Sequence, residues 1–251
     1  MNPFPKKTYS LGLNPLASRL CATTCLSLAL LVPAGRARAA APEEGVAVAI
    51  IYDTSGSMKE PVMDAFGGTA PKYQIANRAL KSVVGQLEAF ATNNSGHKQL
   101  EAGLFVFQGE RGREAVKLGP LDAEALRQFA DSFSRPQGNT PLGNTVAAAA
   151  RALLSSPLAH KHMLVITDGL NTAGPAPDSV LPRLKAEAGR QNASLNFHFV
   201  AFDVDARQFA AVKRQGATVV GAMDEKQLNL QLQFILRQKI LLEDEETPKK
   251  P

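Results

Sequence analysis

The sequence predicts an α/β fold: a doubly wound, mostly parallel central sheet with helices on both faces and one short antiparallel edge strand. Apolar runs of strand length alternate with helical segments along the chain. The first run, 45–52, is almost continuously apolar, as in a strand covered on both faces. Polar residues follow two of the runs directly, at the strand ends where such sheets bind ligands. With 251 residues and 45% apolar content, the chain can bury a large core.

The remaining elements follow from periodicity and capping residues. After 45–52, the segment 58–71 contains Gly67 and Gly68 and is expected to be irregular. The later strands are expected at 100–107, 114–118 (the edge strand), 162–167, 195–202 and 217–222. The helices are expected at 73–90, 121–133, 145–154, 178–191, 206–215 and 225–242. The last segment also alternates at strand period, and Asp224 as an N-cap favours the helix.

The first 39 residues are predicted to be an export signal. Lys6, Lys7 and Arg19 form a basic start, an apolar stretch spans 20–33, and a cleavage pattern ends at Ala39. The apolar stretch is shorter than the roughly 20 residues of a membrane-spanning helix, so we expect no permanent anchor. The mature chain is expected to be periplasmic or secreted, from a bacterium, without a transmembrane segment. It would comprise a linker (40–44), a domain (45–242) and a charged, disordered tail (243–251).

Removal of this leader changes the charge and the cysteine content. The leader carries five of the 28 basic residues and none of the 23 acidic ones, so the mature chain has no net charge. This balance argues against nucleic-acid binding and against polybasic attachment to a membrane. Cys21 and Cys25 also lie in the leader, and neither follows the small residue expected before a lipid-acceptor cysteine. The mature domain therefore has no disulfide and no sulfur ligand for a metal.

Three polar segments predict a metal site. Asp53, Ser55 and Ser57 follow the first strand, Thr140 lies in the loop 138–143 between two glycines, and Asp168 follows the strand 162–167. If the two strands are neighbours, these five side chains form a set of oxygen ligands at one edge of the sheet. Hard divalent cations prefer oxygen ligands, so Mg²⁺ is expected, with Mn²⁺ and Ca²⁺ as alternatives. Two carboxylates balance the dication, and three neutral hydroxyls leave it able to accept a Glu or Asp from another protein.

Alternative interpretations of these and nearby polar residues fit the sequence less well than a single metal site. A single Asp-x-Ser-x-Ser segment can simply cap a helix, but three matching segments in order argue against capping alone. Asp203 and Asp205 are interpreted as loop and cap residues rather than a second cation site. The histidines, at positions 97, 160, 162 and 198, are expected to be packed or superficial and away from the site.

The three segments resemble those of a von Willebrand factor A (VWA) domain with a metal-ion-dependent adhesion site (MIDAS). The D-x-S-x-S signature falls on Asp53, Ser55 and Ser57, the distal threonine on Thr140 and the distal aspartate on Asp168. The resemblance covers about 45–242. It implies that the three hydroxyls touch the metal directly, that one or both aspartates act through water, and that the segment 225–242 can shift when a ligand binds.

Such domains mostly bind proteins rather than catalyse reactions, so we expect a binding module and no enzyme. One alternative is a Mg²⁺-assisted hydrolase or phosphotransferase. Against it, Ser55 stands where a phosphoaspartate enzyme would carry a second aspartate, and a Gly-Lys-Ser/Thr loop is missing. A second alternative is a scaffold with a purely structural metal. The oligomeric state stays open.

Overall fold

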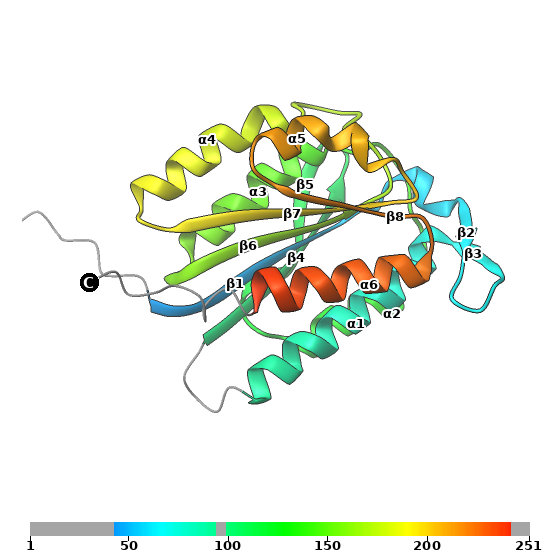
Figure 1. Ribbon diagram of the computed structural model, residues 1–251, viewed down its shortest axis with the longest axis horizontal. Coiled ribbons are helices and arrows are strands. Elements are labelled where there is room, and N and C mark those ends of the chain that lie inside the picture. The colour runs from blue at the N-terminus through cyan, green and yellow to red at the C-terminus, as the bar shows by residue number, and fades with distance from the viewer. Residues whose placement is uncertain (1–42, 94–98, 242–251) are drawn as a thin grey trace, which may run out of the picture. The chain divides into compact units, whose positions relative to one another are not determined.

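The computed structural model describes residues 43–93 and 99–241, which form a sheet between two layers of helices (Figure 1). The predicted export signal, residues 40–42 of the predicted linker, His97 and the predicted tail lie outside the described residues. In the described part, none of the helices is both long enough and apolar enough to cross a membrane.

The main sheet has six strands in the order β5-β4-β1-β6-β7-β8. Its strands are β1 (Glu43–Tyr52), β4 (Gln99–Gln108), β5 (Arg111–Pro120), β6 (Leu158–Thr167), β7 (Ser194–Phe202) and β8 (Thr218–Ala222). Only β5, at one edge, runs antiparallel to its neighbour. The predicted mostly parallel sheet is therefore confirmed, and its antiparallel edge strand is longer than the predicted 114–118.

Helices cover both faces of this sheet, as predicted. One face carries α1 (Lys72–Asn93), α2 (Ala123–Ser132) and α6 (Glu225–Ile235). The other carries α3 (Leu142–Ser155), α4 (Pro177–Arg190) and α5 (Ala210–Arg214). The segment 206–215 is not one helix, because a 3₁₀ turn, η2 (Ala206–Phe209), precedes α5. The last segment is helical, and α6 continues into a π-helical turn, η3 (Leu236–Ile240).

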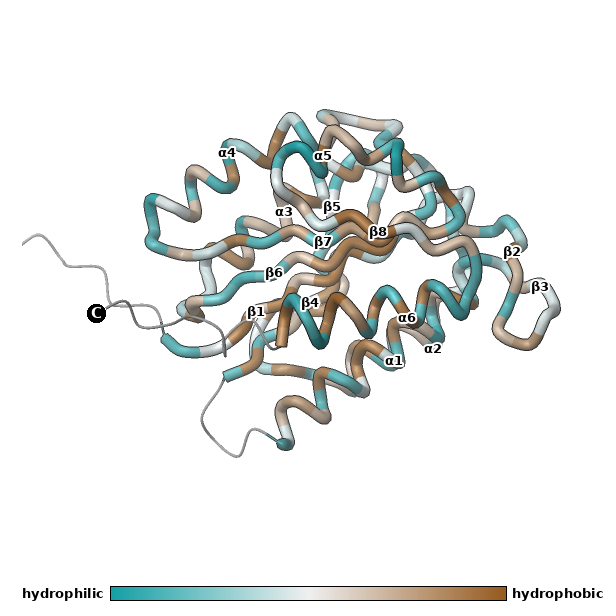
Figure 2. The backbone as a smooth tube through the Cα atoms, viewed as in Figure 1, coloured by the Kyte–Doolittle hydropathy of each residue, from teal (hydrophilic) through white to brown (hydrophobic). Residues whose placement is uncertain are grey.

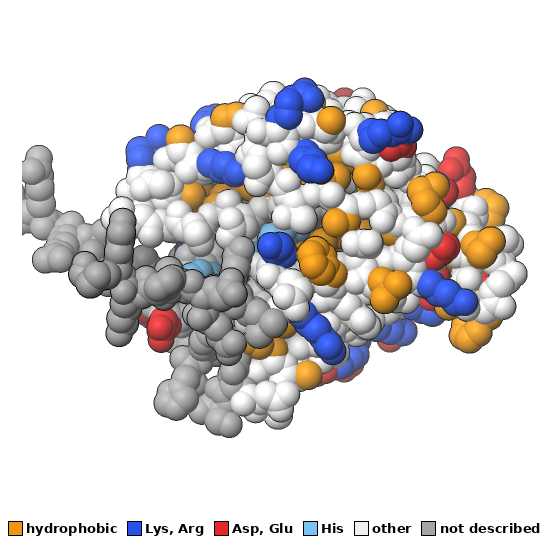
Figure 3. Space-filling model, in the orientation of Figure 1, with side chains coloured by type: hydrophobic (Ala, Val, Ile, Leu, Met, Phe, Trp, Pro, Cys, Tyr) orange, Lys and Arg blue, Asp and Glu red, His pale blue; other side chains and the backbone are white. Residues whose placement is uncertain are grey.

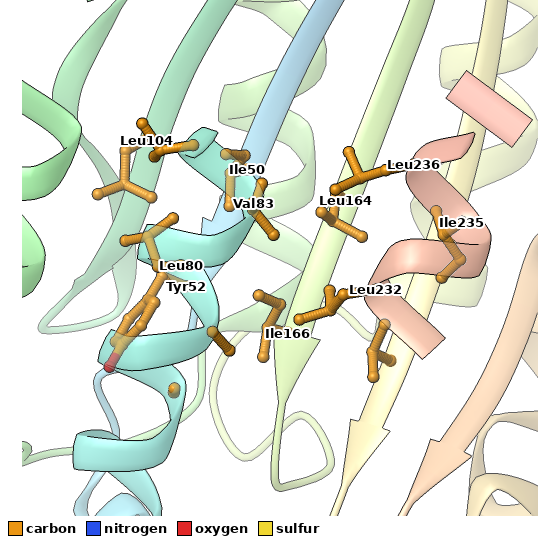
Figure 4. Packing of buried hydrophobic residues seen from close by; sticks show 14 of the residues in the cluster. Ile50, Tyr52, Leu80, Val83, Leu104, Leu164, Ile166, Leu232, Ile235 and Leu236 are labelled. Atoms are coloured by element: carbon orange, nitrogen blue, oxygen red, sulfur yellow. The ribbon is translucent and has the colours of Figure 1, made fainter. Parts of the chain in front are cut away.

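The two faces of β1 belong to two separate cores. Alternate residues such as Ile50 and Tyr52 pack under α1, whereas Ile51 packs under the opposite helices. Figure 2 shows the hydrophobic residues concentrated in the strands between the two helical layers. In Figure 4, Ile50 lies against Val83 of α1. Burial on both faces explains why the run 45–52 is apolar throughout.

Two connections diverge where β1 and β6 end. These strands are parallel neighbours, with Tyr52 opposite Ile166. After β1 the chain passes to α1 on one face, and after β6 it passes to α4 on the other. Because the two connections diverge, the carboxyl ends of β1 and β6 lie at a topological switch point. Asp53 and Asp168 follow these two strands directly.

The segment 58–71, expected to be irregular, instead forms a small hairpin. A 3₁₀ turn, η1 (Gly56–Lys59), leads into β2 (Pro61–Met63), which pairs with β3 (Thr69–Pro71). Asp64 Oδ1 organises the turn by accepting from the backbone N–H groups of Phe66 and Gly68 at 2.9 and 2.8 Å. Strands of three residues are too short to show a period in the sequence, so the prediction was wrong here.

Candidate metal centre

Asp53 is fully buried at the end of β1 and shapes the first loop. Its Oδ1 accepts a hydrogen bond from Ser55 N at 2.8 Å, and its Oδ2 accepts one from Thr167 Oγ1 at 2.6 Å. Burial, followed by the nearby Asp168 carboxylate, raises the pKa of Asp53 to about 6. The fold therefore holds a carboxylate whose charge is costly unless a cation balances it.

The two serines connect this loop to Asp168. Ser55 and Ser57 place their Oγ atoms 3.1 Å apart, and Ser57 Oγ donates to Asp168 Oδ1 at 2.8 Å. Ser55 and Asp168 are buried, whereas Ser57 is half-buried. The set of oxygens thus lies just below the surface, and Ser57 is its most accessible member.

Thr54 stands between these residues but faces β4 instead. Its Oγ1 donates to the carbonyl of Phe107 and accepts from the N–H of Phe107, each at 3.2 Å. Ser55 occupies the N-cap position of η1 and makes no side-chain capping bond. The motif therefore does not serve to cap the helix; Thr54 fastens the loop, and the serine hydroxyls lie with the carboxylates.

The second loop is tied to the first through the backbone. Gly56 N donates to Gly138 O at 3.1 Å, and Gln137 N donates to Thr54 O at 2.8 Å. Gly138 has a φ of 83°, a left-handed conformation that side chains rarely adopt. The backbone conformation at the start of the loop 138–143 therefore favours glycine at position 138.

Thr140 is tied to the third loop in turn. Its N–H donates to Thr172 Oγ1 at 2.8 Å, and its carbonyl accepts from Thr172 N at 3.0 Å. Its own Oγ1 lies 3.9 Å from where a Cβ on Gly169 would stand. A Cβ on Gly143 would fall 2.0 Å from Pro175 O, so only glycine permits the close approach of α3 to this loop. Thr140 is thereby held beside the segment that carries Asp168.

Lys72, which the sequence reasoning missed, joins the site as a buried cation. It is 3% exposed. Its Nζ lies 2.9 Å from Glu60 Oε2, 3.0 Å from Asp203 Oδ2 and 3.1 Å from Asp168 Oδ2. Burial alone would lower the pKa of Lys72, but these three carboxylates together raise it above its ordinary value. A lysine opening a helix opposes the helix dipole, and this was the one available signal that Lys72 had a special partner.

Asp203 and Asp205 have different roles. Asp205 caps η2 by accepting from Arg207 N at 2.9 Å, as expected. Asp203 lies in the loop after β7, also as expected, where it has a φ of 53° and pairs with Lys72. Asp203 follows β7, so a third strand end of the sheet contributes to the surroundings of the site.

The histidines that the structure describes, His160, His162 and His198, lie on the sheet, away from these loops. His162 and His198 are buried and stacked, with ring centroids 5.5 Å apart. They lie on β6 and β7, several residues before the ends that carry the site.

The donor set fits a hard divalent cation. Within residues 43–93 and 99–241, no group of three or more His, Cys, Asp and Glu could hold a metal ion. A metal at the strand ends would therefore depend on hydroxyls beside two carboxylates, which is an all-oxygen set of the kind that Mg²⁺ accepts. Burial and the neighbouring Asp168 carboxylate raise the pKa of Asp53, and a divalent cation would offset the cost of charging both carboxylates.

Comparison with known proteins identifies the family. The family model for the von Willebrand factor type A domain matches residues 47–231. The chain belongs to the von Willebrand factor type A domain family. No curated relative matches the sequence.

Solved structures share the VWA fold at low sequence identity. A D319A mutant of the PilB minor pilin from Streptococcus sanguinis superposes with a TM-score of 0.62 at 15% identity, covering 82% of this chain and 64% of the pilin. The vWF domain of the type V pili tip protein Mfa5 from Porphyromonas gingivalis gives a TM-score of 0.59 at 10% identity, covering 83% of this chain and 98% of that domain. This VWA domain thus spans less than two thirds of the pilin and nearly all of the Mfa5 domain.

A third neighbour contains a metal at its own site. Proximal thread matrix protein 1 from the mussel byssus, with a zinc-occupied MIDAS motif, gives a TM-score of 0.52 at 16% identity. The match covers 78% of this chain and 48% of that protein. At these identities the three neighbours establish the fold of this VWA domain.

Proposed function

We propose that this VWA domain is an exported binding module that grips an acidic side chain of a partner protein through a divalent cation. The cation is expected to be Mg²⁺, with Mn²⁺ or Ca²⁺ as alternatives. The residues that would hold it are Asp53, Ser55, Ser57, Thr140 and Asp168. The observation that supports this proposal is that Ser55, Ser57 and Asp168 are linked through their side chains, with Asp53 buried beside them and Thr140 next to the loop that carries Asp168. Only two of these five side chains are carboxylates.

The five proposed ligands contribute in two ways: two carry charge and three are neutral. Asp53 and Asp168 supply the negative charge that a dication requires, and the hydroxyls of Ser55, Ser57 and Thr140 supply neutral oxygens. A cation held in this way is a Lewis acid with room for a carboxylate oxygen from outside. Because Ser57 is half-buried at the mouth of the site, a partner's side chain can approach from that side.

Direct hydrogen bonds join the three loops, which favours reception of a ligand over a purely structural ion. The first and second loops share two backbone hydrogen bonds. Thr140 and Thr172 share one further backbone bond and one bond from Thr140 N to the Thr172 hydroxyl. The first and third loops are joined by Ser57 and Asp168 at 2.8 Å. We therefore expect a cation at this site to bind a ligand rather than only to join the loops.

The surface near the site carries exposed apolar side chains. Figure 3 shows hydrophobic side chains gathered over α6 and the β2–β3 hairpin. They include Phe66, which is 92% exposed at the hairpin turn, and Met63, Met223 and Leu230, each more than half exposed. Exposed apolar groups beside a polar site are typical of a surface that contacts another protein.

An extracytoplasmic location completes the proposal. It rests on the export signal expected at residues 1–39, with cleavage after Ala39, and on the domain expected at 45–242. The names of the pilus proteins among the structural neighbours support such a location and a protein partner. We propose no catalytic activity.

Selection of peptides tests this function directly. A random peptide library displayed on phage is captured by the immobilised domain in Mg²⁺ and eluted with EDTA. The selected peptides should share a Glu or Asp whose replacement by Gln or Asn abolishes capture, and the Asp53→Asn domain should retain none of them. Peptides that lack an essential acidic residue, or that stay bound in EDTA, would contradict the proposal. Mg²⁺-dependent hydrolysis of phosphate esters, lost in Asp53→Asn, would instead support the enzyme alternative.

A further inference from the structure

Lys72 gathers carboxylates from three different strand ends. Glu60 belongs to the connection after β1, Asp168 follows β6, and Asp203 follows β7. All three lie within 3.1 Å of one ammonium nitrogen that is almost entirely buried. Lys72 N also donates to the carbonyl of Glu60 at 2.9 Å, which fixes the start of α1 beside the site.

Asp168 is shared between this lysine and the proposed metal ligands. Its Oδ1 accepts from Ser57, and its Oδ2 accepts from Lys72. The side chain of Asp168 has no exposed surface, so both of its oxygens are oriented by protein groups. A charged group that binds one oxygen of a ligand carboxylate withdraws negative charge from the other.

The Lys72 ammonium would therefore oppose a divalent cation that shares Asp168. The two positive charges would lie on either side of one carboxylate, in a site shielded from solvent, where their repulsion is only weakly screened. Asp203 and Glu60 offset part of this repulsion. Glu60 does so less effectively, because its side chain is 65% exposed, compared with 30% for Asp203.

We propose that Lys72 is a built-in counter-ion that orients Asp168 and sets the affinity of the site for its divalent cation, keeping that affinity lower than the oxygen set alone would give. This inference rests on the proposed metal-dependent function. In this proposal Lys72 orients Asp168 and lowers the metal affinity without binding the metal. It contacts Asp168, not the hydroxyls of Ser55, Ser57 and Thr140.

Calorimetric titration of Mg²⁺ and Mn²⁺ into the wild type and variants tests the proposal. Lys72→Met should bind both ions at least about 10-fold more tightly, because one opposing charge is removed. Lys72→Arg keeps the charge on a larger, planar group and should bind both ions less tightly than Lys72→Met. Lys81→Met is the matched control, since Lys81 also lies on α1 but pairs with the exposed Asp131 at the surface. It should leave the affinity unchanged.

A merely structural lysine would give the opposite sign, because its loss would loosen the site and weaken binding. Melting in EDTA and in Mg²⁺ checks that the variants are folded. The rise in melting temperature on adding Mg²⁺ should be larger for Lys72→Met than for the wild type. If Lys72→Met does not fold, Asp203→Asn serves instead: it frees Lys72 to act on Asp168 and should weaken Mg²⁺ binding severalfold.

The outcomes separate the two proposals. If the wild type binds Mg²⁺ and Lys72→Met binds it equally well or more weakly, the role of Lys72 is overturned and the proposed function stands. Unchanged affinity in Asp203→Asn has the same meaning. If the wild type binds neither Mg²⁺ nor Mn²⁺, both proposals fail.

Discussion

Two pairs of ionisable side chains are buried at the same sheet, and their surroundings differ. At the strand ends, Asp53 and Asp168 lie among hydroxyl donors, and Lys72 binds one of them. In the middle of the neighbouring strands, His162 and His198 stack on each other, with Nδ1 of the first 3.2 Å from Nε2 of the second. The carboxylates lie beside hydroxyl donors and one ammonium group, whereas burial keeps the histidines neutral.

The difference shows how burial alone can be told from a binding site. Burial, with a smaller contribution from neighbouring cationic groups, lowers the pKa of His162 to about 3 and that of His198 to about 4. A neutral histidine pair needs no counter-ion. Asp53, with its pKa raised to about 6, still has hydrogen bonds that hold its ionised form, and this conflict is what a bound cation would resolve.

The largest expected effect is acid destabilisation by the histidine pair. Their pKa values are lower in the folded than in the unfolded state, so the unfolded chain takes up protons that the folded chain does not. Stability should therefore fall as the pH drops below about 6.5, by roughly 2 kcal/mol for each histidine at pH 5. Chemical denaturation at pH 7 and pH 5 measures the loss.

Substitution of both histidines, as His162→Leu/His198→Leu, should remove most of this pH dependence. NMR titration of the imidazoles gives a check that needs no variant. A histidine of this pair that titrates near pH 6.5 in the folded protein would break the comparison.

Asp53→Asn should have the next largest effect, on the metal rather than on folding. Loss of one of two carboxylates should weaken Mg²⁺ binding by roughly 100-fold. The matched control is Thr54→Val, one residue further on, whose hydroxyl bonds to Phe107 of β4. It should cost about 1 kcal/mol of stability and leave the calorimetric affinity intact. Equal metal affinity in Asp53→Asn and the wild type would remove Asp53 from the site.

Thr140→Val should reduce the affinity for Mg²⁺ by about 10-fold, since it removes one neutral ligand and no charge. Thr145→Val offers the comparison: Thr145 is also buried, but its hydroxyl donates to Pro141 O at 2.9 Å within the start of α3. Titration of both variants separates a ligand hydroxyl from a helix hydroxyl. If the two substitutions weaken Mg²⁺ binding equally, the Thr140 hydroxyl is not a metal ligand.

The smallest effect concerns the metal-free protein. The pKa of Asp53 is higher in the folded than in the unfolded state, so folding takes up a proton between about pH 6 and pH 4. Acidification from pH 7 to pH 5 in EDTA should therefore contribute about 1 kcal/mol of stabilisation, opposite in sign to the histidines. Asp53→Asn should lack this contribution and lose more stability on acidification than the wild type. An identical pH dependence in the two proteins would contradict this assignment.

The sequence predicted the sheet and the three loops because their signals are local. The apolar run that ends at Asp53 marks both a strand and a strand end, and the same holds for Asp168. Lys72 was missed because its partners lie 12, 96 and 131 positions away in the chain, and only the folded topology brings them together. The hairpin was missed because three-residue strands carry no detectable period.

Diffraction from crystals grown with Mn²⁺ tests the central claim most directly, since manganese gives an anomalous signal. One strong peak should lie between the three loops, about 2 Å from the hydroxyl oxygens of Ser55, Ser57 and Thr140. Absence of a peak there at saturating Mn²⁺, or a peak that excludes these hydroxyls, would contradict the metal site and the binding function built on it.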